Sequence, residues 1–141
     1  MAVDPRDPPP EVRAFLTERH LATLTTRRAD GSPHVVPVGV TYRPEEGMAR
    51  VITWATSAKA RHVAAAPGQR VALCQVDGGR WLTLEGPAEV SDDPDRVAVA
   101  VELYTERYRP PKRRSDRVVI EVRVDRILGA RFAARGPSPR G

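Results

Sequence analysis

Short β-rich runs separated by glycine turns limit the folds open to this chain more than any other feature of its sequence. An Asp-Gly pair separates LATLTTRR (21–28) from PHVVPVGVTYR (33–43), and Asp-Gly-Gly separates RVALCQV (70–76) from RWLTLEGPAEV (80–90). Asp-Gly between two such runs is a strong hairpin signal, because glycine adopts the positive φ that tight turns require. A chain built from hairpins rather than from strand–helix–strand units favours an antiparallel sheet.

Two further runs, 48–56 and 117–128, complete a set of six predicted strands. The run 80–90 alternates with a period of two, which is typical of a strand with one buried face. The residues that share its apolar face are Leu82, Leu84, Gly86, Ala88 and Val90. In 117–128 the corresponding set is Val118, Ile120, Val122 and Val124.

Three short helices are predicted between the strands. EVRAFLTERH (11–20) has its apolar residues at helical spacing, and SAKARHVAAA (57–66) can be capped by Ser57 and ended by Pro-Gly. The third begins at Ser-Asp-Asp-Pro (91–94) and runs to about Tyr108, with proline at its first position.

These elements predict a mainly β fold with peripheral α-helices, in which an antiparallel sheet curls into a small barrel. An open sandwich would produce the same alternation. We expect residues 11–130 to form the single domain of this 141-residue chain, residues 1–10 a flexible N-terminal arm, and residues 131–141 a flexible tail.

Composition narrows the function classes. The net charge is +5, which permits an anionic partner without identifying one. No apolar run is long enough to span a membrane, and acids and prolines at the start replace the apolar stretch of a signal peptide, so we expect a cytoplasmic protein. The single cysteine, Cys74, excludes an intramolecular disulfide and an all-cysteine metal site.

The common cofactor and metal motifs are absent from the sequence: there is no G-x-G-x-x-G, no P-loop and no H-E-x-x-H. The three histidines, His20, His34 and His62, do not have metal-ligand spacing, and no metal site is predicted.

The segment 53–61 is the best candidate for binding an anion. Hydroxyl residues at a strand end are followed by a helix N-terminus, where the helix dipole favours negative charge. Lys59 and Arg61 add formal positive charge. A capped helix with solvated basic residues explains the same pattern equally well.

Two other positions could meet a flat ligand. Pro37 lies inside a predicted strand, where it cannot donate a hydrogen bond, so it marks an edge strand or a place where a ligand meets the backbone. Trp81, beside Arg80, could contact a planar ring or pack under its hairpin.

The loop 108–114 is the densest cluster of basic residues. It could bind carboxylates or simply be solvated. A nucleic-acid partner is not expected, because the loop lacks the interleaved aromatic residues that stack on bases.

Together, FLTERHLATLTTRRADGSPHVVPVGVTY, ARVITWATSAKARHV, ALCQVDGGRWLTLEGPAEV and RVVIEVRVDRILGA resemble the pyridoxamine 5′-phosphate oxidase-like family. This family has a split β-barrel that binds flavin mononucleotide (FMN) or coenzyme F420, and the resemblance is to its actinobacterial F420-dependent branch. It covers about residues 12–130. It implies a homodimer with cofactor sites at the subunit interface.

The resemblance also implies site residues. Those lining the deazaflavin ring would be Val36, Pro37, Val38 and Gly39. Those holding the phosphate and the start of the oligoglutamate tail would be Thr53, Thr56, Ser57, Lys59, Ala60 and Arg61. Those approaching from neighbouring strands, from this subunit or the other, would be Gln75, Arg80 and Trp81.

The implied reaction is hydride transfer from C5 of the reduced deazaflavin to a conjugated substrate, with biliverdin and its reduction to bilirubin as the expected case. No catalytic side chain is predicted, because the proton can come from solvent. Substrate carboxylates would meet Arg109, Lys112, Arg113 or Arg114. Two alternatives stay open: an FMN-dependent oxidoreductase or oxidase of the same fold, and a non-catalytic protein that binds F420 or a tetrapyrrole.

Overall fold

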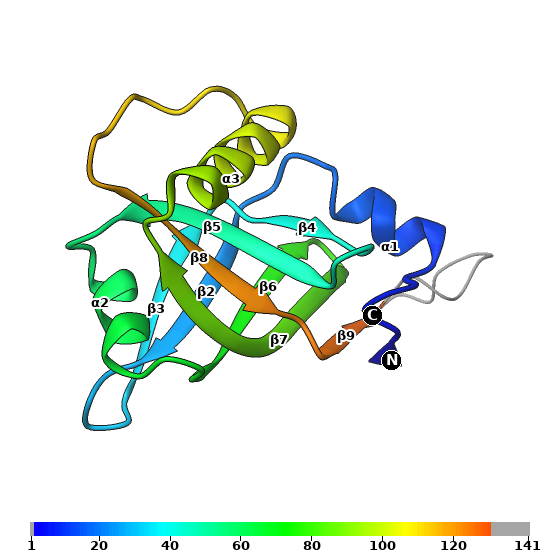
Figure 1. Ribbon diagram of the computed structural model, residues 1–141. Helices are drawn as coiled ribbons and strands as arrows, with labels where there is room; N and C mark the ends of the chain where they lie inside the picture. The colour runs from blue at the N-terminus through cyan, green and yellow to red at the C-terminus, as the bar shows by residue number, and fades with distance from the viewer. Residues whose placement is uncertain (1, 131–141) are drawn as a thin grey trace.

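The computed structural model describes residues 2–130 (Figure 1). Its strands are β1 (Ala2–Val3), β2 (Ala22–Arg27), β3 (Pro33–Val38), β4 (Thr41–Arg43), β5 (Met48–Trp54), β6 (Arg70–Asp77), β7 (Arg80–Ser91), β8 (Arg117–Arg123) and β9 (Arg126–Ala130). Its helices are α1 (Pro10–Phe15), α2 (Ala58–Ala65) and α3 (Pro94–Arg107).

All strand pairs are antiparallel, and the main path of the sheet runs β3-β2-β6-β7-β8-β5-β4. The long strand β7 joins the two halves: Arg80–Pro87 pair with β6, whereas Ala88–Ser91 pair with β8. β9 pairs with the first half of β7. Because β3 and β4 end the path without pairing to each other, the barrel is split, which confirms the predicted fold class.

A glycine is required where β7 crosses between the halves. A Cβ added at Gly86 would lie 2.0 Å from the carbonyl oxygen of Arg123, at the end of β8. Only a residue without a side chain allows the two backbones to approach this closely.

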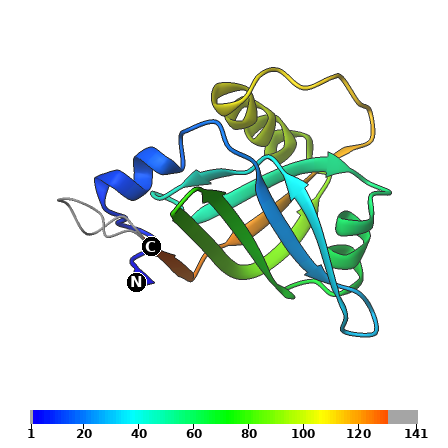
Figure 2. The same ribbon diagram turned by 180° about the vertical axis from the view of Figure 1, so that it is seen from behind.

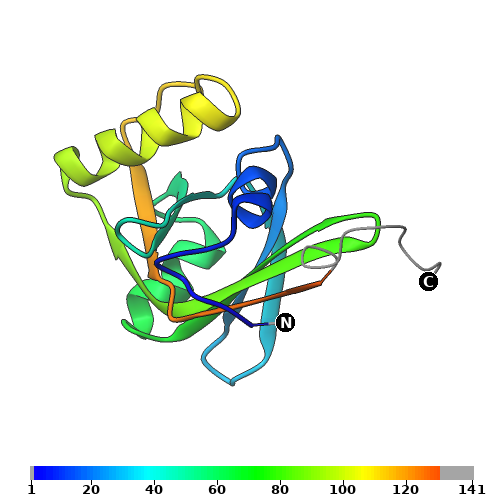
Figure 3. The same ribbon diagram turned by 90° about the vertical axis from the view of Figure 1, so that its right-hand side faces the viewer.

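The core fills the inside of the barrel, and the alternation predicted for 80–90 is confirmed by the burial of Leu82, Leu84 and Ala88. Strand β8 differs from its predicted alternation. Val119 and Glu121 are buried on its other face, because α3 packs against β8 and covers that face (Figure 3).

The predicted helices are present, with shifted ends. α2 is capped by Ser57 as predicted, and Asp93 caps α3 by accepting a hydrogen bond from the Arg96 backbone N–H at 3.0 Å. α1 is shorter than predicted and ends at Phe15. The predicted strands 33–43 and 117–128 are each interrupted by two residues, giving β3 and β4, and β8 and β9.

The N-terminal arm lies against the sheet in its described part. Residues 2–3 pair with β9, and the Tyr42 hydroxyl donates to the Pro5 carbonyl at 2.5 Å. These contacts hold Ala2, Val3 and Pro5 against the sheet, and the flexibility of the arm stays a prediction. The tail predicted over 131–141 lies outside the described residues. Within residues 2–130, no helix combines the length and hydropathy needed to cross a membrane.

Candidate functional site

A pocket of about 240 Å³ lies where β3 and β5 end and α2 begins, bounded also by α3 and the loop that follows it. We call it the strand-end pocket. Its lining residues are Pro37, Val38, Gly39, Ile52, Thr53, Trp54, Lys59, Tyr104, Pro111, Arg114 and Arg117.

Hydroxyl groups tie the strand end to the helix start beside this pocket. The Thr53 hydroxyl donates to Ser57 Oγ at 2.9 Å, and Ser57 Oγ accepts from the Ala60 backbone N–H at 3.3 Å. Thr53 and Ser57 are both buried. The cap therefore fixes the first turn of α2, and with it the position of Lys59.

Positive charge gathers around Trp54, a 40% exposed side chain at this pocket. The Lys59 ammonium and the Arg114 guanidinium each lie 5.0 Å from the centre of its ring. A cation–π contact with the Trp54 ring stabilises both cations in these positions. Burial lowers the pKa of Lys59 below its ordinary value of 10.5.

Little of this charge is neutralised by the chain. Arg114 forms a two-bond ion pair with Asp116, at 2.8 and 3.0 Å. Among the described residues, Lys59 and Arg117 form no ion pair with a carboxylate. No carboxylate is among the residues from 2–130 that line the pocket. The strand-end pocket is therefore suited to an anionic group.

The wall opposite these cations depends on a glycine. A Cβ added at Gly39 would lie 2.7 Å from Cε2 of Tyr104 and 3.1 Å from Cε2 of Tyr108. The adjacent Val40 backbone is held by α3: its N–H donates to the Tyr108 hydroxyl at 3.1 Å, and its carbonyl accepts from Arg107 at 2.6 Å. The end of α3 therefore shapes the pocket through Arg107 and Tyr108, which do not line it themselves.

The structure brings part of the predicted site together. The predicted residues that line the pocket are Pro37, Val38, Gly39, Thr53, Lys59 and Arg114. Ser57 lies behind Thr53 as the helix cap, Thr56 is exposed in the preceding turn, and Ala60 is buried. Val36 instead packs against the hydrophobic core.

Gln75 has a structural position rather than a place in the pocket. It is 2% exposed, its amide donates to the Phe15 carbonyl at 2.8 Å, and its side-chain oxygen accepts from Arg107 at 2.6 Å. The nitrogen and the oxygen of its side-chain amide are thus both hydrogen-bonded within the chain. A strand pattern alone does not show that α1 and α3 supply these partners.

Arg80 and Trp81 lie at the start of β7, away from the pocket-lining residues. Arg109, Lys112 and Arg113 are exposed on the loop and do not line the pocket, unlike Arg114. Sequence reasoning missed Ile52, Tyr104, Pro111 and Arg117 as lining residues. Tyr104 falls inside the predicted third helix, but nothing in the sequence showed which strand end it would face.

Arg61 lies in a second hollow, of about 600 Å³, between α2 and the β2–β3 turn. We call it the basic groove, since Arg27, Arg28, Arg61 and His62 are among its lining residues. His62 Nδ1 is hydrogen-bonded to the Thr26 hydroxyl at 2.8 Å. Burial, then the neighbouring His34 and arginines, lowers the pKa of His62.

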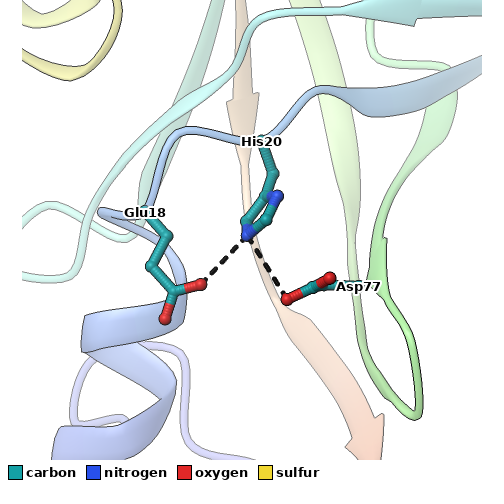
Figure 4. Close-up of side chains that lie close together, drawn as sticks. All are labelled: Glu18, His20 and Asp77. Atoms are coloured by element: carbon teal, nitrogen blue, oxygen red, sulfur yellow. Dashed lines mark hydrogen bonds and ion pairs between the residues drawn. The ribbon is translucent and has the colours of Figure 1, made fainter.

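Figure 4 shows a cluster of Glu18, His20 and Asp77 near the tip of the β6–β7 hairpin. His20 Nε2 lies 2.9 Å from Glu18 Oε1 and 3.7 Å from Asp77 Oδ2. Arg80 donates to Glu18 at 2.9 Å and also contacts Asp77. The guanidinium thus supplies the positive charge that these carboxylates need, and the cluster joins the end of α1 to the hairpin.

Comparison with known proteins finds a matching family and a similar protein. The family model described as pyridoxamine 5′-phosphate oxidase matches residues 8–130. A protein of Mycobacterium tuberculosis named F420H(2)-dependent biliverdin reductase is 55% identical over 117 residues, which cover 83% of this chain and 84% of that protein.

Solved structures show the same fold. A structure described as an F420 reductase has a TM-score of 0.67 and 27% identity, covering 82% of this chain and 94% of its own. A conserved hypothetical protein of M. tuberculosis has a TM-score of 0.71 and 23% identity, and 92% of each chain is covered. The fold, the extent of the family match and the close relative agree, and this chain belongs to the pyridoxamine 5′-phosphate oxidase family.

Proposed function

We propose that this protein is an F420-dependent reductase that transfers a hydride to a conjugated substrate, with biliverdin, converted to bilirubin, as the substrate. The strand-end pocket carries this proposal, because it sets unneutralised cations beside an apolar wall. The name of the 55% identical relative supports both the cofactor and the substrate. We further propose that the protein acts in the cytoplasm.

The described residues fit an anionic cofactor with a flat ring. Pro37, Val38 and Gly39 offer the ring an apolar wall, to which Gly39 adds no side chain. Lys59, beside the Thr53–Ser57 hydroxyl pair, offers a charge-assisted donor to a phosphate. F420, when bound and reduced, supplies the hydride.

The basic groove is our proposed place for the oligoglutamate tail. Arg61 lies on α2 two residues after Lys59. The helix therefore supplies Lys59 to the strand-end pocket and Arg61 to the basic groove. Arg27 and Arg28 face the same groove. Successive carboxylates of the tail would each find a guanidinium there.

The chain's part in the reaction is to bind, to orient and to exclude water. Arg114 is the predicted carboxylate-binding residue with the best support, because it alone of the four basic loop residues lines the pocket. No carboxylate or histidine lies among the described lining residues. We propose that the proton comes from solvent.

We also propose a homodimer. Figure 2 shows that no helix covers the outer face of β3, β2 and β6. By strand register, one end of this face carries Arg27, Arg70 and Glu85, and the rest is uncharged: Thr23, Thr25, Val35, Pro37, Ala72, Cys74, Val76, Trp81 and Thr83. Pro37 belongs to this face and to the strand-end pocket, so a partner bound here would approach the site, and Trp81 could contribute across the interface.

Titration with F420 and with FMN, followed by the fluorescence of each, tests the cofactor assignment. We expect selective F420 binding, weakened about 10- to 100-fold by Lys59→Ala, since a charge-assisted hydrogen bond contributes about 1.5–3 kcal/mol. Arg19→Ala, which removes an exposed charge that lines neither the strand-end pocket nor the basic groove, is the matched control. Selective FMN binding would move the protein to an FMN-dependent activity, and F420 binding without biliverdin reduction would identify a binding protein.

A further inference from the structure

A third hollow adjoins the strand-end pocket along α3. It has a volume of about 520 Å³ and shares two of its lining residues, Arg114 and Arg117, with that pocket. We call it the helix groove. Its other lining residues are Asp92, Pro94, Val97, Ala98, Val101, Glu102 and Ser115.

The floor of the helix groove is apolar. Val97 and Val101 lie one turn apart on α3 and are only half-buried, and Ala98 beside them is exposed. Figure 1 shows the loop after α3 arching back from the helix end to β8, so helix and loop together bound the groove. An apolar strip left open between a helix and a loop suits the apolar body of a ligand.

The two shared arginines form the end of the groove that meets the strand-end pocket. Arg114 is already paired with Asp116. Arg117 donates to the Lys112 carbonyl and, among the described residues, forms no ion pair with a carboxylate. Asp92 and Glu102 also line the groove and would repel a ligand's carboxylates. The charges therefore direct an anionic group toward Arg117.

We infer that the helix groove binds the apolar part of the substrate, an elongated conjugated carboxylate, and that Arg117 receives a carboxylate where the groove meets the strand-end pocket. This inference rests on the proposed function, in which the ring of the cofactor occupies the strand-end pocket. The shared arginines place the two ligands side by side. The groove thus selects substrates that have a long apolar body and an acidic group.

A matched pair of variants on α3 tests the groove. Val101→Asp puts a carboxylate into it, whereas Val99→Asp puts the same group on α3 at a 39% exposed position outside it. Biliverdin binding is measured from its absorption change without cofactor, and F420 binding from its fluorescence. We expect Val101→Asp to weaken biliverdin binding about 10-fold or more, with F420 binding unchanged, and Val99→Asp to change neither.

Arg117→Gln tests the carboxylate contact separately and protects the test against misfolding of Val101→Asp. It should weaken binding of biliverdin about 10-fold but leave binding of biliverdin dimethyl ester, which lacks the free carboxylates, unchanged. The inference would be overturned if Arg117→Gln weakened the binding of both compounds equally, or if the two aspartate variants had equal effects. In either case, biliverdin reduction by the wild type would still support the proposed function. Absence of biliverdin binding by the wild type would overturn both.

Discussion

At the scale of single residues, Lys59 makes cofactor binding depend on pH. Its pKa lies below 10.5 because burial disfavours the charged form, whereas a bound anion favours it. F420 affinity should therefore fall as pH rises toward 10.5, since the cation that binds the anion is lost. Titrations from about pH 8 upward measure this. Lys59→Arg, which stays charged, should flatten the dependence; an equally steep fall in that variant would assign it to another group.

Gly39 is the second residue whose role can be isolated. Alanine there would bring its Cβ within 2.7 Å of the Tyr104 ring, so the ring must move and the pocket wall with it. We expect Gly39→Ala to destabilise the fold by about 1–3 kcal/mol and to weaken F420 binding, measured by denaturant unfolding and by fluorescence titration. Adding Tyr104→Leu should restore part of both losses. No recovery in the double variant would show that the ring contact is not the cause.

At the scale of elements, the Glu18 cluster makes the attachment of α1 to the β6–β7 hairpin sensitive to acid. Hydrogen bonds from Arg80 first, then from His20, lower the pKa of Glu18 from 4.5 to about 2. A lowered carboxyl pKa gives stability that is present above the unfolded-state value and is lost as pH falls from 4.5 toward 2. Thermal unfolding across this range should show a steeper loss of stability in the wild type than in Glu18→Gln. Glu45→Gln, at an exposed turn, should behave like the wild type.

Most elements could be predicted from local signals. Ser57 and Asp93 cap the two longer helices because caps act over three or four residues, a distance that a sequence pattern records. The need for a glycine at position 39 could not be predicted, because the Tyr104 ring that a Cβ there would meet lies more than 60 residues away. Burial of Val119 depends likewise on α3 covering β8.

At the scale of the whole molecule, the same distinction applies to the candidate site. Thr53, Ser57 and Lys59 are close in sequence, so local spacing could place Thr53 and Lys59 at one pocket with Ser57 bonded to Thr53; that they hold a phosphate together stays a prediction. Gln75 was assigned from the family resemblance, and its side chain is instead hydrogen-bonded to Arg107 from α3 and to the Phe15 carbonyl of α1. Arg117 was missed for the corresponding reason: its side chain reaches the pocket because the loop before it turns back over the strand ends (Figure 1).

Association of two chains is the property that the uncovered sheet face predicts. Val35 and Val76 lie on this face and are 56% and 59% exposed in the single chain. A stable interface buries about 800 Å² on each partner, and the uncharged part of this face can supply that area. Sedimentation equilibrium should give twice the chain mass of 15.5 kDa. Val35→Asp with Val76→Asp should give 15.5 kDa and weaker F420 binding, because two buried carboxylates would face their copies.

Val99→Asp is the control for that experiment, since it adds a carboxylate to an exposed position on α3, away from the uncovered face. It should leave the mass at twice that of one chain. If the double variant kept the mass of two chains, another surface would form the interface. If it became a single chain with unchanged F420 affinity, the cofactor site would be complete within one subunit, and Trp81 would have no part in binding across the interface.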